Sequence, residues 1–509
     1  MISYATHTKS DNSKKGGKQV RRYVTIGMII CASLCQALSV SAQLASSPWP
    51  CYCHDAQHTS RSANCAGPYT PALQWAYAAP GAISTSPAIA VDGTIYFGSN
   101  GNLYAVNSNG ALKWKSGWAI KSSSPAVGRD GTIYVGNASA NVNSGLFALN
   151  PDGSQQWFFL AGNLVEYSSP TVGSDGTIYV GNTVLGGGGS YLFAVSPSGS
   201  QKWAAGVPET IYASPAIGTD GNVYVTNGPC LCSANSSGAH SIAYVTYPND
   251  SFDYSSPSIG PDGTIYAGTF FGALYAVGTN GWHTWLADSP CTPAIGADGT
   301  IYTGSLMCVL FSVSASGSIN WGYSAGGNIT SPASIDCNGT IYFGSNDGIV
   351  HALNADGTEK WEYSIGHAVT WTGPAIGNNN TIYLGASDGN LYAIGPPVIV
   401  ANVNLGNYSG DFSLMRVRVN LMQSNGTVVA SQTVQAASTI SVTFSGFQYG
   451  NYTVQAFAPE WLSQSQPVTF NSPTTTVNMT LLNGDVNGDN FVEDQDYSIM
   501  GVYWYQGGT

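Results

Sequence analysis

Apolar and polar positions alternate in short runs through residues 73–395, and Asp-Gly or Asn-Gly pairs separate many of these runs. Such pairs between β-rich runs indicate hairpins, in tight turns whose two central residues both take positive φ. The motif D-G-T-I-Y at Asp92 returns in close copies at intervals of 36 to 45 residues, beginning at Asp130, Asp175, Asp220, Asp262, Asp298, Asn338 and Asn379. Each interval holds four short runs, so we predict one four-stranded antiparallel sheet per repeat.

One such sheet cannot bury both of its faces alone, so the repeats must pack face to face around an axis. The pattern therefore predicts an all-β fold with an eight-bladed β-propeller over residues 73–396. The last repeat ends at Ile394 without a fourth run, whereas L-Q-W-A-Y around Trp75 precedes the first motif. We expect residues 73–77 to supply the missing strand, which leaves no unpaired sheet edge.

Two further positions recur with the repeat. Small residues, as in Ser86-Pro87-Ala88, mark the strand expected nearest the axis, where space is limited. A Trp closes most repeats, and we interpret this residue as a wedge between neighbouring sheets, since a large ring at a fixed strand position fits that need. The wedges would be Trp114, Trp157, Trp203, Trp285, Trp321 and Trp361.

Residues 94–114 read T-I-Y-F-G-S, then N-L-Y-A-V-N, then A-L-K-W. This repeat resembles that of the β-propellers named for pyrroloquinoline quinone (PQQ) enzymes. Enzymes of that family bring an adjacent Cys-Cys disulfide over the quinone, a catalytic Asp, and calcium ligands inside large insertions. Here no two cysteines after the leader are adjacent and the repeats are short. We therefore expect no PQQ and no dehydrogenase activity, and we assign no catalytic residue.

Residues 397–482 alternate apolar and polar positions between Gly and Asn turns, which predicts a small β-sandwich. The order G-N-Y-T-V from Gly450 resembles a strand of carboxypeptidase-regulatory-like and prealbumin-type modules. We interpret this domain as a spacer. Carbohydrate binding is the alternative, because sugars stack on aromatic faces and the segment carries Tyr408, Tyr449, Tyr452 and Trp461.

Residues 483–509 contain a candidate calcium loop. Twelve residues from Asp485 place oxygen ligands at the spacing that lets one short loop wrap a hard cation. The ligands would be the side chains of Asp485, Asn487, Asp489 and Asp496 and the backbone carbonyl of Phe491. The segment resembles one type I dockerin repeat, an EF-hand-like unit, and the resemblance implies a cohesin-type partner. A solvated acidic turn is the alternative. A dockerin normally has two such repeats, whereas residues 483–509 contain one.

The first 42 residues indicate export. A basic stretch is followed by an apolar run over residues 23–38 and by Val40-Ser41-Ala42, which predicts a signal peptide cleaved after Ala42. A membrane anchor is the alternative, although Ser33 and Gln36 interrupt the short run. The mature chain is expected to be secreted, or periplasmic, with no integral membrane segment.

The net charge of the mature chain limits the classes of partner that we expect. The leader holds six of the fifteen basic residues and one of the 27 acidic ones, so the mature chain keeps nine basic and 26 acidic groups, a formal charge of −17. Nucleic acid and anionic membrane surfaces are poor partners for such a chain. An extracellular glycan or a cohesin-type protein is consistent with this charge.

Residues 43–72 form a lead-in that contains the densest polar cluster of the N-terminal half, His54, Asp55, His58 and Arg61. The cluster could clasp one mouth of the propeller or bind a ligand there. Eight cysteines remain after cleavage, and an even number in an exported protein favours disulfides. Zinc held by the lead-in cysteines, including Cys65, is the alternative, but its ligand spacing is not met.

Three functions remain open. The first is a secreted, non-catalytic propeller that binds or displays a partner and carries a calcium module. The second is a carbohydrate-binding component of an extracellular assembly that degrades polysaccharide. The third is a PQQ-dependent dehydrogenase, which the cysteine spacing disfavours.

Overall fold

The computed structural model describes residues 43–482 except 65–70, 139–143, 185–188, 247–249, 253, 279–281, 287–290, 379–380, 407–415, 446, 448–449, 459–462 and 473. Every regular element in these ranges is a β-strand, so the all-β prediction is confirmed for the described part of the chain. Within the same ranges, no helix has the length and apolar character needed to cross a membrane.

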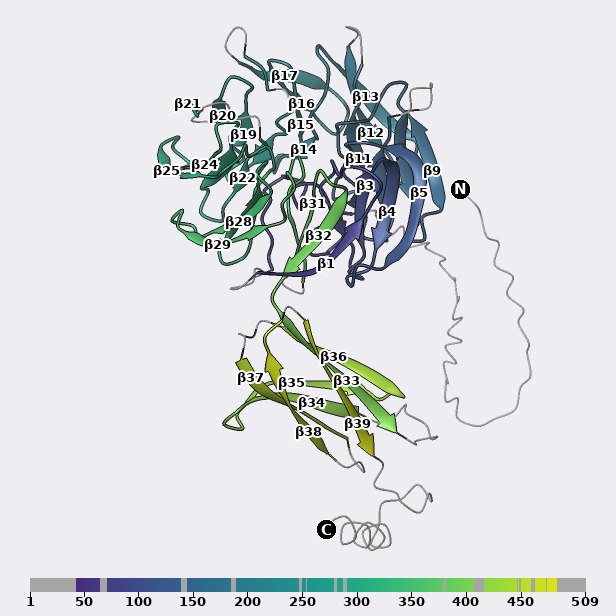
Figure 1. Cartoon of the computed structure of the whole chain (residues 1–509). Helices are drawn as coiled ribbons and strands as arrows, with labels where there is room; N and C mark the ends of the chain where they lie inside the picture. Colours follow the sequence, from purple (N-terminus) through teal and green to yellow (C-terminus); the bar gives the residue numbers. More distant parts are fainter. Residues whose placement is uncertain are drawn as a thin grey trace, which may run out of the picture. The chain divides into compact units, whose positions relative to one another are not determined.

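Between residues 72 and 395 the strands form eight four-stranded antiparallel sheets around a common centre (Figure 1). The first strands of the sheets are β2 (Ala88–Ile89), β6 (Ala126–Val127), β10 (Thr171–Val172), β14 (Ala216–Ile217), β18 (Ser258–Ile259), β22 (Ala294–Ile295), β26 (Ser334–Ile335) and β30 (Ala375–Ile376). The second strands are β3 (Ile95–Ser99), β7 (Ile133–Gly136), β11 (Ile178–Gly181), β15 (Val223–Asn227), β19 (Ile265–Gly268), β23 (Ile301–Gly304), β27 (Ile341–Gly344) and β31 (Ile382–Gly385). These are the T-I-Y strands of the repeat.

The third strands are β4 (Gly101–Val106), β8 (Gly145–Leu149), β12 (Ser190–Val195), β16 (Cys230–Ala234), β20 (Ala273–Val277), β24 (Val309–Val313), β28 (Ile349–Leu353) and β32 (Asn390–Gly395). The fourth strands are β5 (Leu112–Ile120), β9 (Gln155–Leu160), β13 (Gln201–Val207), β17 (His240–Val245), β21 (Trp282–Trp285), β25 (Ile319–Ser324), β29 (Glu359–Ser364) and β1 (Ala72–Ala78).

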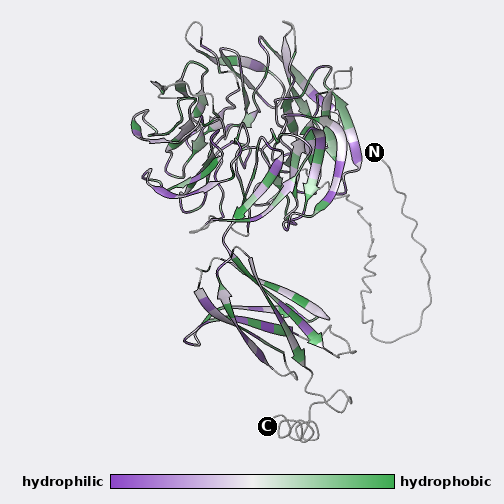
Figure 2. Cartoon of the chain, in the orientation of Figure 1, coloured by the Kyte–Doolittle hydropathy of each residue, from purple (hydrophilic) through white to green (hydrophobic). Residues whose placement is uncertain are grey.

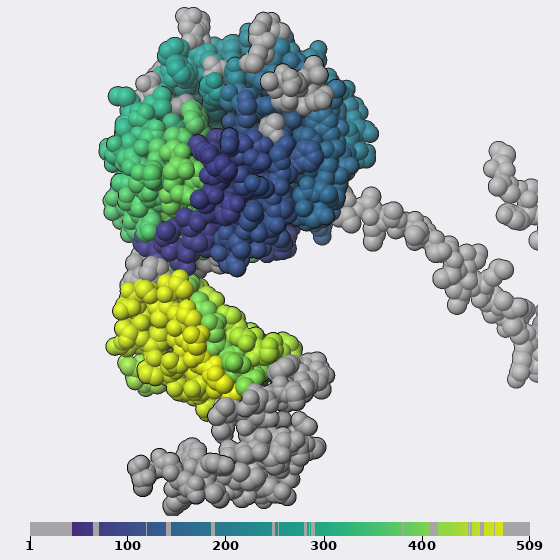
Figure 3. Space-filling model, turned by 45° about the vertical axis from the view of Figure 1, so that its right-hand side comes forward, coloured from purple at the N-terminus to yellow at the C-terminus, as the bar shows by residue number. Residues whose placement is uncertain are grey.

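The eighth sheet takes its fourth strand from the start of the described chain. Strand β1 pairs antiparallel with β32, where Ala76 stands opposite Tyr392 and Tyr77 opposite Leu391. In the space-filling view, the purple N-terminal residues accordingly lie against the green residues of the last sheet (Figure 3). The prediction that residues 73–77 complete the last sheet is confirmed.

The turn at the repeated Asp differs from the predicted type. Ala90 donates its N–H to Thr94 O at 2.8 Å, and Gly93 donates to Ala90 O at 3.0 Å. Gly93 has φ +80°, whereas Asp92 is not among the residues with positive φ, so one central position rather than two is left-handed. Asp92 instead accepts the N–H of Thr94 at 2.9 Å, which fixes the turn through its side chain.

The Trp residues of the fourth strands join neighbouring sheets. Six indole N–H groups donate to a turn carbonyl of the next sheet at 2.7 to 3.1 Å. Beneath each ring lies a turn glycine with positive φ, where a Cβ atom would come within 2.6 to 2.8 Å of the ring. The donor and glycine pairs are Trp75 and Gly110, Trp114 and Gly153, Trp157 and Gly199, Trp203 and Gly238, Trp282 and Gly317, and Trp321 and Gly357.

In the fifth sheet, Trp282 contacts the next sheet and donates to Ala315 O at 2.9 Å. The side chain of Trp285, the wedge predicted for this sheet, lies outside the described ones. Trp361 packs against Tyr342 of its own sheet, but among the described residues its buried indole N–H has no hydrogen-bond partner. Its neighbour is the eighth sheet, in which β32 and β1 are not joined by a turn. The carbonyl that serves the other Trp residues is therefore missing at this junction.

The core of this region lies between adjacent sheets. One cluster, for example, joins Tyr96 and Leu103 of the first sheet to Ile133 and Phe147 of the second. Figure 2 shows that green hydrophobic and purple hydrophilic stretches both occur along these strands. Each sheet buries its faces against its two neighbours, as the repeat pattern requires.

Residues 398–482 form two further sheets. The first has the order β36 (Thr439–Ser445), β33 (Val398–Gly406), β39 (Thr474–Leu482), and the second has the order β35 (Val428–Gln435), β34 (Arg416–Gln423), β37 (Gly450–Phe457), β38 (Gln464–Phe470). One hydrophobic core contains residues of both sheets. Tyr452 packs against this core, near Phe470, so it is not a free aromatic surface.

Candidate functional site

Hydroxyl groups from successive sheets meet at the centre of the eight-sheet array. Ser86 donates its backbone N–H to Ser124 Oγ at 2.9 Å, and Ser124 donates in the same way to Ser169 Oγ at 3.0 Å. The series continues from Ser169 to Ser214, from Ser214 to Ser256 and from Ser256 to Thr292. Gly373 of the last sheet donates to Ser86 Oγ at 2.8 Å, which brings the two ends of the array together.

The eight repeats differ at the position two residues before each of these residues, which is four residues before the start of each first strand. In chain order this position is occupied by Ser84, Ser122, Tyr167, Tyr212, Tyr254, Pro290, Thr330 and Trp371. Tyr167, Tyr212 and Tyr254 come from three consecutive sheets, and their ring centroids lie 4.9 to 6.0 Å apart. Trp371, from the last sheet, reaches Tyr254 with a centroid separation of 5.8 Å. The four rings therefore form one aromatic cluster.

Two of these rings sit on strained backbone. Tyr254 has φ +65° and Trp371 has φ +63°, a region that large side chains rarely adopt. Both side chains also remain exposed, at 43% and 47%. Left-handed backbone at a bulky residue costs on the order of 1–3 kcal/mol and clusters at ligand clamps and active sites.

The hydroxyls and the aromatic cluster line one cavity of about 300 Å³. Its lining residues are Tyr52, Ser84, Ser122, Ser124, Tyr167, Ser169, Tyr212, Ser214, Tyr254, Ser256 and Trp371. None of these residues carries a charge. Glu166, next to Tyr167 in the chain, is paired with Lys121 at 3.3 Å. We call this space the axial pocket.

The lead-in segment crosses the carboxyl-terminal ends of the first strands. Its carbonyls at Trp49, Pro50, Ala56, Gln57, Thr59 and Ser60 accept the N–H groups of Ile89, Val127, Ile217, Ile259, Ile295 and Ile335 at 2.7 to 2.9 Å. Six of the eight first strands are thus tied to one segment. Tyr52 of this segment lines the axial pocket and is hydrogen-bonded to Thr292 Oγ1 at 2.9 Å. Residues 49–60 therefore clasp one end of the eight-sheet array, as one of the two interpretations of the lead-in cluster predicts.

The polar cluster of the lead-in holds this segment in shape. Asp55 accepts the N–H groups of Gln57 and Thr59, the hydroxyl of Thr59, and a bond from His54 Nδ1 at 3.3 Å. Burial alone would raise the pKa of Asp55, but the hydrogen bonds from His54 and Thr59 lower it below its usual value. A carboxylate so fully occupied fixes a turn and has no capacity left for a ligand.

His58 is the buried histidine of the lead-in. Its Nδ1 lies 3.1 Å from Pro257 O and its Nε2 3.4 Å from Thr171 Oγ1. Burial lowers the pKa of His58 to about 4, against a smaller opposing effect of Asp55. The ring is therefore neutral at neutral pH and bridges two sheets beneath the axial pocket.

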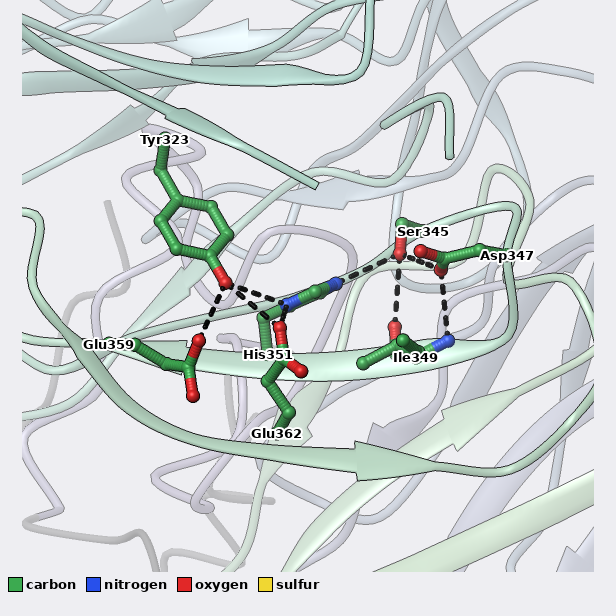
Figure 4. A network of polar contacts seen from close by, with 7 residues as sticks. All are labelled: Tyr323, Ser345, Asp347, Ile349, His351, Glu359 and Glu362. Carbon is green, nitrogen blue, oxygen red and sulfur yellow. Dashed lines mark hydrogen bonds and ion pairs between the residues drawn. The ribbon is translucent and has the colours of Figure 1, made fainter. Parts of the chain in front are cut away.

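A second polar network lies between the sixth and seventh sheets (Figure 4). His351 Nε2 is 3.0 Å from Ser345 Oγ, and His351 Nδ1 is 3.1 Å from Glu362 Oε1. This order of hydroxyl, imidazole and carboxylate is that of a hydrolytic triad. The sequence did not reveal it, because the three residues belong to three separate strands or turns and match no spaced motif.

The network nevertheless lacks the other features of a hydrolytic site. Ser345 and His351 are buried, and Ser345 donates its hydroxyl to Asp347 Oδ1 rather than presenting it to a cavity. Tyr323 of β25 donates to Glu362 at 2.9 Å and to Glu359 at 3.1 Å, both on β29 of the next sheet. Burial lowers the pKa of His351, against the raising effect of Glu362 and Asp347. We assign this network to the joining of two sheets.

Most predicted disulfides are not formed. Six described cysteines are free thiols, namely Cys51, Cys53, Cys230, Cys232, Cys291 and Cys308, while Cys337 is disulfide-bonded. Cys230 and Cys232 stand two residues apart on β16, where the strand geometry holds their Cα atoms near the upper limit for a bridge. Burial raises the pKa of Cys53 and of Cys291 to about 12, so neither thiol is a ready nucleophile or metal ligand.

The predicted calcium ligands Asp485, Asn487, Asp489, Phe491 and Asp496 lie outside the described residues, as do Cys65, Tyr408, Tyr449 and Trp461. Within the described ranges, no group of three or more His, Cys, Asp or Glu residues is placed to hold a metal ion. The zinc alternative for the lead-in therefore finds no support there.

Sequence reasoning did not identify the axial pocket. The signal was present, because aligning the eight repeats places Tyr167, Tyr212, Tyr254 and Trp371 at one equivalent position. A position that changes from repeat to repeat while its neighbours stay constant contributes little to architecture. Their meeting at one point could be recognised only after the ring of sheets was known.

A protein-family model described as outer membrane protein assembly factor BamB matches residues 68–277 and 255–398. Solved structures with a similar fold include BamB from Moraxella catarrhalis, at 16% identity and TM-score 0.51, covering 64% of this chain and 100% of that one. A quinohemoprotein alcohol dehydrogenase from Comamonas testosteroni, at 14% identity and TM-score 0.57, covers 70% of this chain and 82% of its own.

A europium-containing methanol dehydrogenase is also similar, at 11% identity and TM-score 0.56, covering 69% of this chain and 98% of that one. No curated protein matches the sequence. At these identities the structural likenesses show a propeller-like fold and carry no activity, because one fold hosts many functions.

Proposed function

The chain belongs to the family described as outer membrane protein assembly factor BamB, and from that premise we propose that it is a non-catalytic binding scaffold. In this proposal residues 73–396 are an eight-bladed β-propeller whose axial pocket receives the ligand. Residues 397–482 are a β-sandwich spacer, and residues 483–509 are a dockerin-like module. The chain is exported and acts outside the cytoplasm.

The axial pocket is the observation that supports this proposal best. It combines buried hydroxyls with exposed rings on strained backbone, which is an arrangement suited to holding a ligand. Among the described residues that line it, none carries a carboxylate, imidazole, amine or thiol group. This composition supports a binding role over a catalytic one.

Thermal unfolding in the presence of small molecules tests the proposal directly. Screening neutral, anionic and cationic compounds against the full mature chain should find ligands that raise the unfolding temperature. The same ligands should raise the unfolding temperature of a Trp371→Ala variant by less, and they should be recovered chemically unchanged. A compound converted catalytically by the protein would contradict the proposal.

Two of the similar structures are dehydrogenases, so the enzyme reading has its own test. The described cysteines near the axis, Cys51, Cys53 and Cys291, are free thiols. The resemblance to PQQ enzymes implies a disulfide of adjacent cysteines, and this sequence has none after its leader. Adding PQQ with calcium should give no tight, stoichiometric absorbance; its appearance would favour the dehydrogenase.

The second candidate is a carbohydrate-binding component of a polysaccharide-degrading assembly. Hydroxyl and aromatic groups lining one pocket favour it, because sugars form hydrogen bonds at their edges and stack on rings through their faces. A cohesin-type protein would then be the partner of the C-terminal module. Binding of the full chain to a glycan array would support this candidate over a purely protein-binding scaffold.

The calcium proposal for residues 483–509 has a separate experiment. Calcium titration of the full chain should show one saturable site that is lost in the Asp485→Ala, Asp489→Ala double variant. The axial pocket should keep its ligand in that variant. Equal calcium uptake by both proteins would remove the metal assignment and leave the propeller proposal intact.

A further inference from the structure

The described residues that line the axial pocket are all neutral. Glu166, which precedes Tyr167 in the chain, is paired with Lys121 at 3.3 Å. Burying an ionic ligand against neutral walls would leave its charge without a partner, at a cost of several kcal/mol. The pocket therefore selects an uncharged ligand.

One layer of the pocket presents hydroxyl donors. The oxygens of Ser124, Ser169, Ser214 and Ser256 each accept a backbone N–H from the preceding sheet at 2.9 to 3.0 Å. Each hydroxyl keeps its own proton, for which the described residues provide no hydrogen-bond acceptor. Four buried hydroxyls in one cavity thus suit a ligand that carries several oxygen acceptors.

The rings of the aromatic cluster cannot enclose a cation. Their centroids lie 4.9 to 6.0 Å apart, which is the distance of direct contact between rings. A quaternary ammonium held between two faces needs more room than this. The cluster instead offers the exposed surfaces of Tyr254 and Trp371, on which a flat, weakly polar face can stack.

The pocket ends at the lead-in segment. Tyr52 lines it, and backbone bonds from residues 49–60 tie that segment to six first strands. A volume of about 300 Å³ is at the small end of ligand pockets. A small cavity that ends at this segment admits the end of a chain and excludes the middle of one.

We propose that the axial pocket binds the terminal unit of a neutral oligosaccharide. The sugar hydroxyls and ring oxygen accept from the four serines, and one sugar face stacks on Trp371 and Tyr254. This inference rests on the binding function proposed above and adds the ligand class and the mode of binding.

Calorimetric titration of the full mature chain tests it with linear gluco-, xylo- and manno-oligosaccharides of increasing length, with oligogalacturonate as the charged probe and a cyclodextrin as the probe without ends. We expect one neutral linear series to bind with an affinity that stops rising after the first few units. Oligogalacturonate and cyclodextrin should bind at least about ten-fold more weakly.

Variants locate the site. Trp371→Ala should weaken binding by about ten-fold, and Trp371→Tyr, which keeps a stacking ring, by less. Tyr191 is the matched control, because it is an aromatic residue of β12 exposed to a similar degree, 45% against 47% for Trp371. Tyr191→Ala should bind like the unmodified protein.

Four outcomes separate the two proposals. Trp371-dependent binding of oligogalacturonate alone, or of a cyclodextrin as tightly as its linear counterpart, would overturn the saccharide-end inference and keep the binding function. Cleavage of a bound oligosaccharide would keep the site and overturn the non-catalytic reading. Saccharide binding unaffected by Trp371→Ala would place the site elsewhere and reject the inference. Absence of binding to every probe would reject it as well, and the thermal screen with unrelated compounds then decides the binding function.

Discussion

Two positions of the repeat behave in opposite ways. At the wedge position, Trp157 and its equivalents make the same contact again and again, with an indole N–H on a turn carbonyl and a ring on a turn glycine. At the pocket rim the equivalent residue changes from serine to tyrosine to tryptophan around the ring. Contacts between sheets are therefore made by the same pair of residues in each repeat, whereas a binding site at the axis needs the repeats to differ.

The reason is geometric. A junction between two sheets occurs at every step of the array, so one solution serves every step. The axis occurs once, and all eight sheets approach it together. Eight identical large side chains at the rim would collide there. Eight identical small side chains would leave no specific binding surface.

Removing one ring at each of the two positions tests whether their contributions to stability differ. Trp157→Ala removes a packed ring and its bond to Pro197 O, and should lower the apparent free energy of unfolding by about 3 kcal/mol. Trp371→Ala removes an exposed ring and should change it by under about 1 kcal/mol. Denaturant unfolding of both variants measures the difference; equal losses would show that the rim is structural too.

Lowering the pH should weaken the contacts of the lead-in, which no repeat duplicates, more than the contacts of the Trp wedges. His58 has a folded pKa of about 4, below the ordinary value near 6.5, so the unfolded chain binds its proton more tightly. Stability is therefore complete above about pH 6.5 and falls by up to about 3 kcal/mol as the pH drops toward 4.

The matched variant for this pH effect is His58→Asn. Asn accepts the left-handed backbone of this position, where φ is +57°, and does not titrate. The loss of stability between pH 6.5 and 4 should be smaller in this variant. An unchanged pH profile would assign the acid sensitivity to other groups.

The missing partner of Trp361 offers a finer test of the wedges. Trp157→Phe removes a made hydrogen bond and leaves Pro197 O without its donor, at a cost of about 1 kcal/mol beyond the smaller ring. Trp361→Phe removes a buried N–H that has no partner among the described residues, so it should cost less. Thermal unfolding of the two variants compares them; an equal cost would mean that Trp361 is bonded after all.

The smallest expected effect concerns strain at the rim. Glycine adopts positive φ without penalty, so Trp371→Gly should unfold at a higher temperature than Trp371→Ala, by about 1 kcal/mol in stability. Both variants lose the ring and should lose ligand binding alike. A less stable Gly variant would show that the backbone at Trp371 is not strained in solution.

The local elements of the repeat and their number could be predicted from the sequence. Because each D-G-T-I-Y copy combines a turn residue with alternating apolar positions, it specifies a hairpin whatever surrounds it, and eight copies imply eight such units. It also determined that residues 73–77 complete the last sheet, since a fourth run was missing at one end and spare at the other.

Tertiary structure alone decided which residues meet. Neither the aromatic cluster, spread from Tyr167 to Trp371, nor the network of Ser345, His351 and Glu362 has a spacing that a motif could capture. The free thiols and the contact of Trp282 with the next sheet also depend on strand register and on distances across sheets. Periodicity along a chain encodes what each segment becomes, but the proximity of distant segments arises only when the sheets pack against one another.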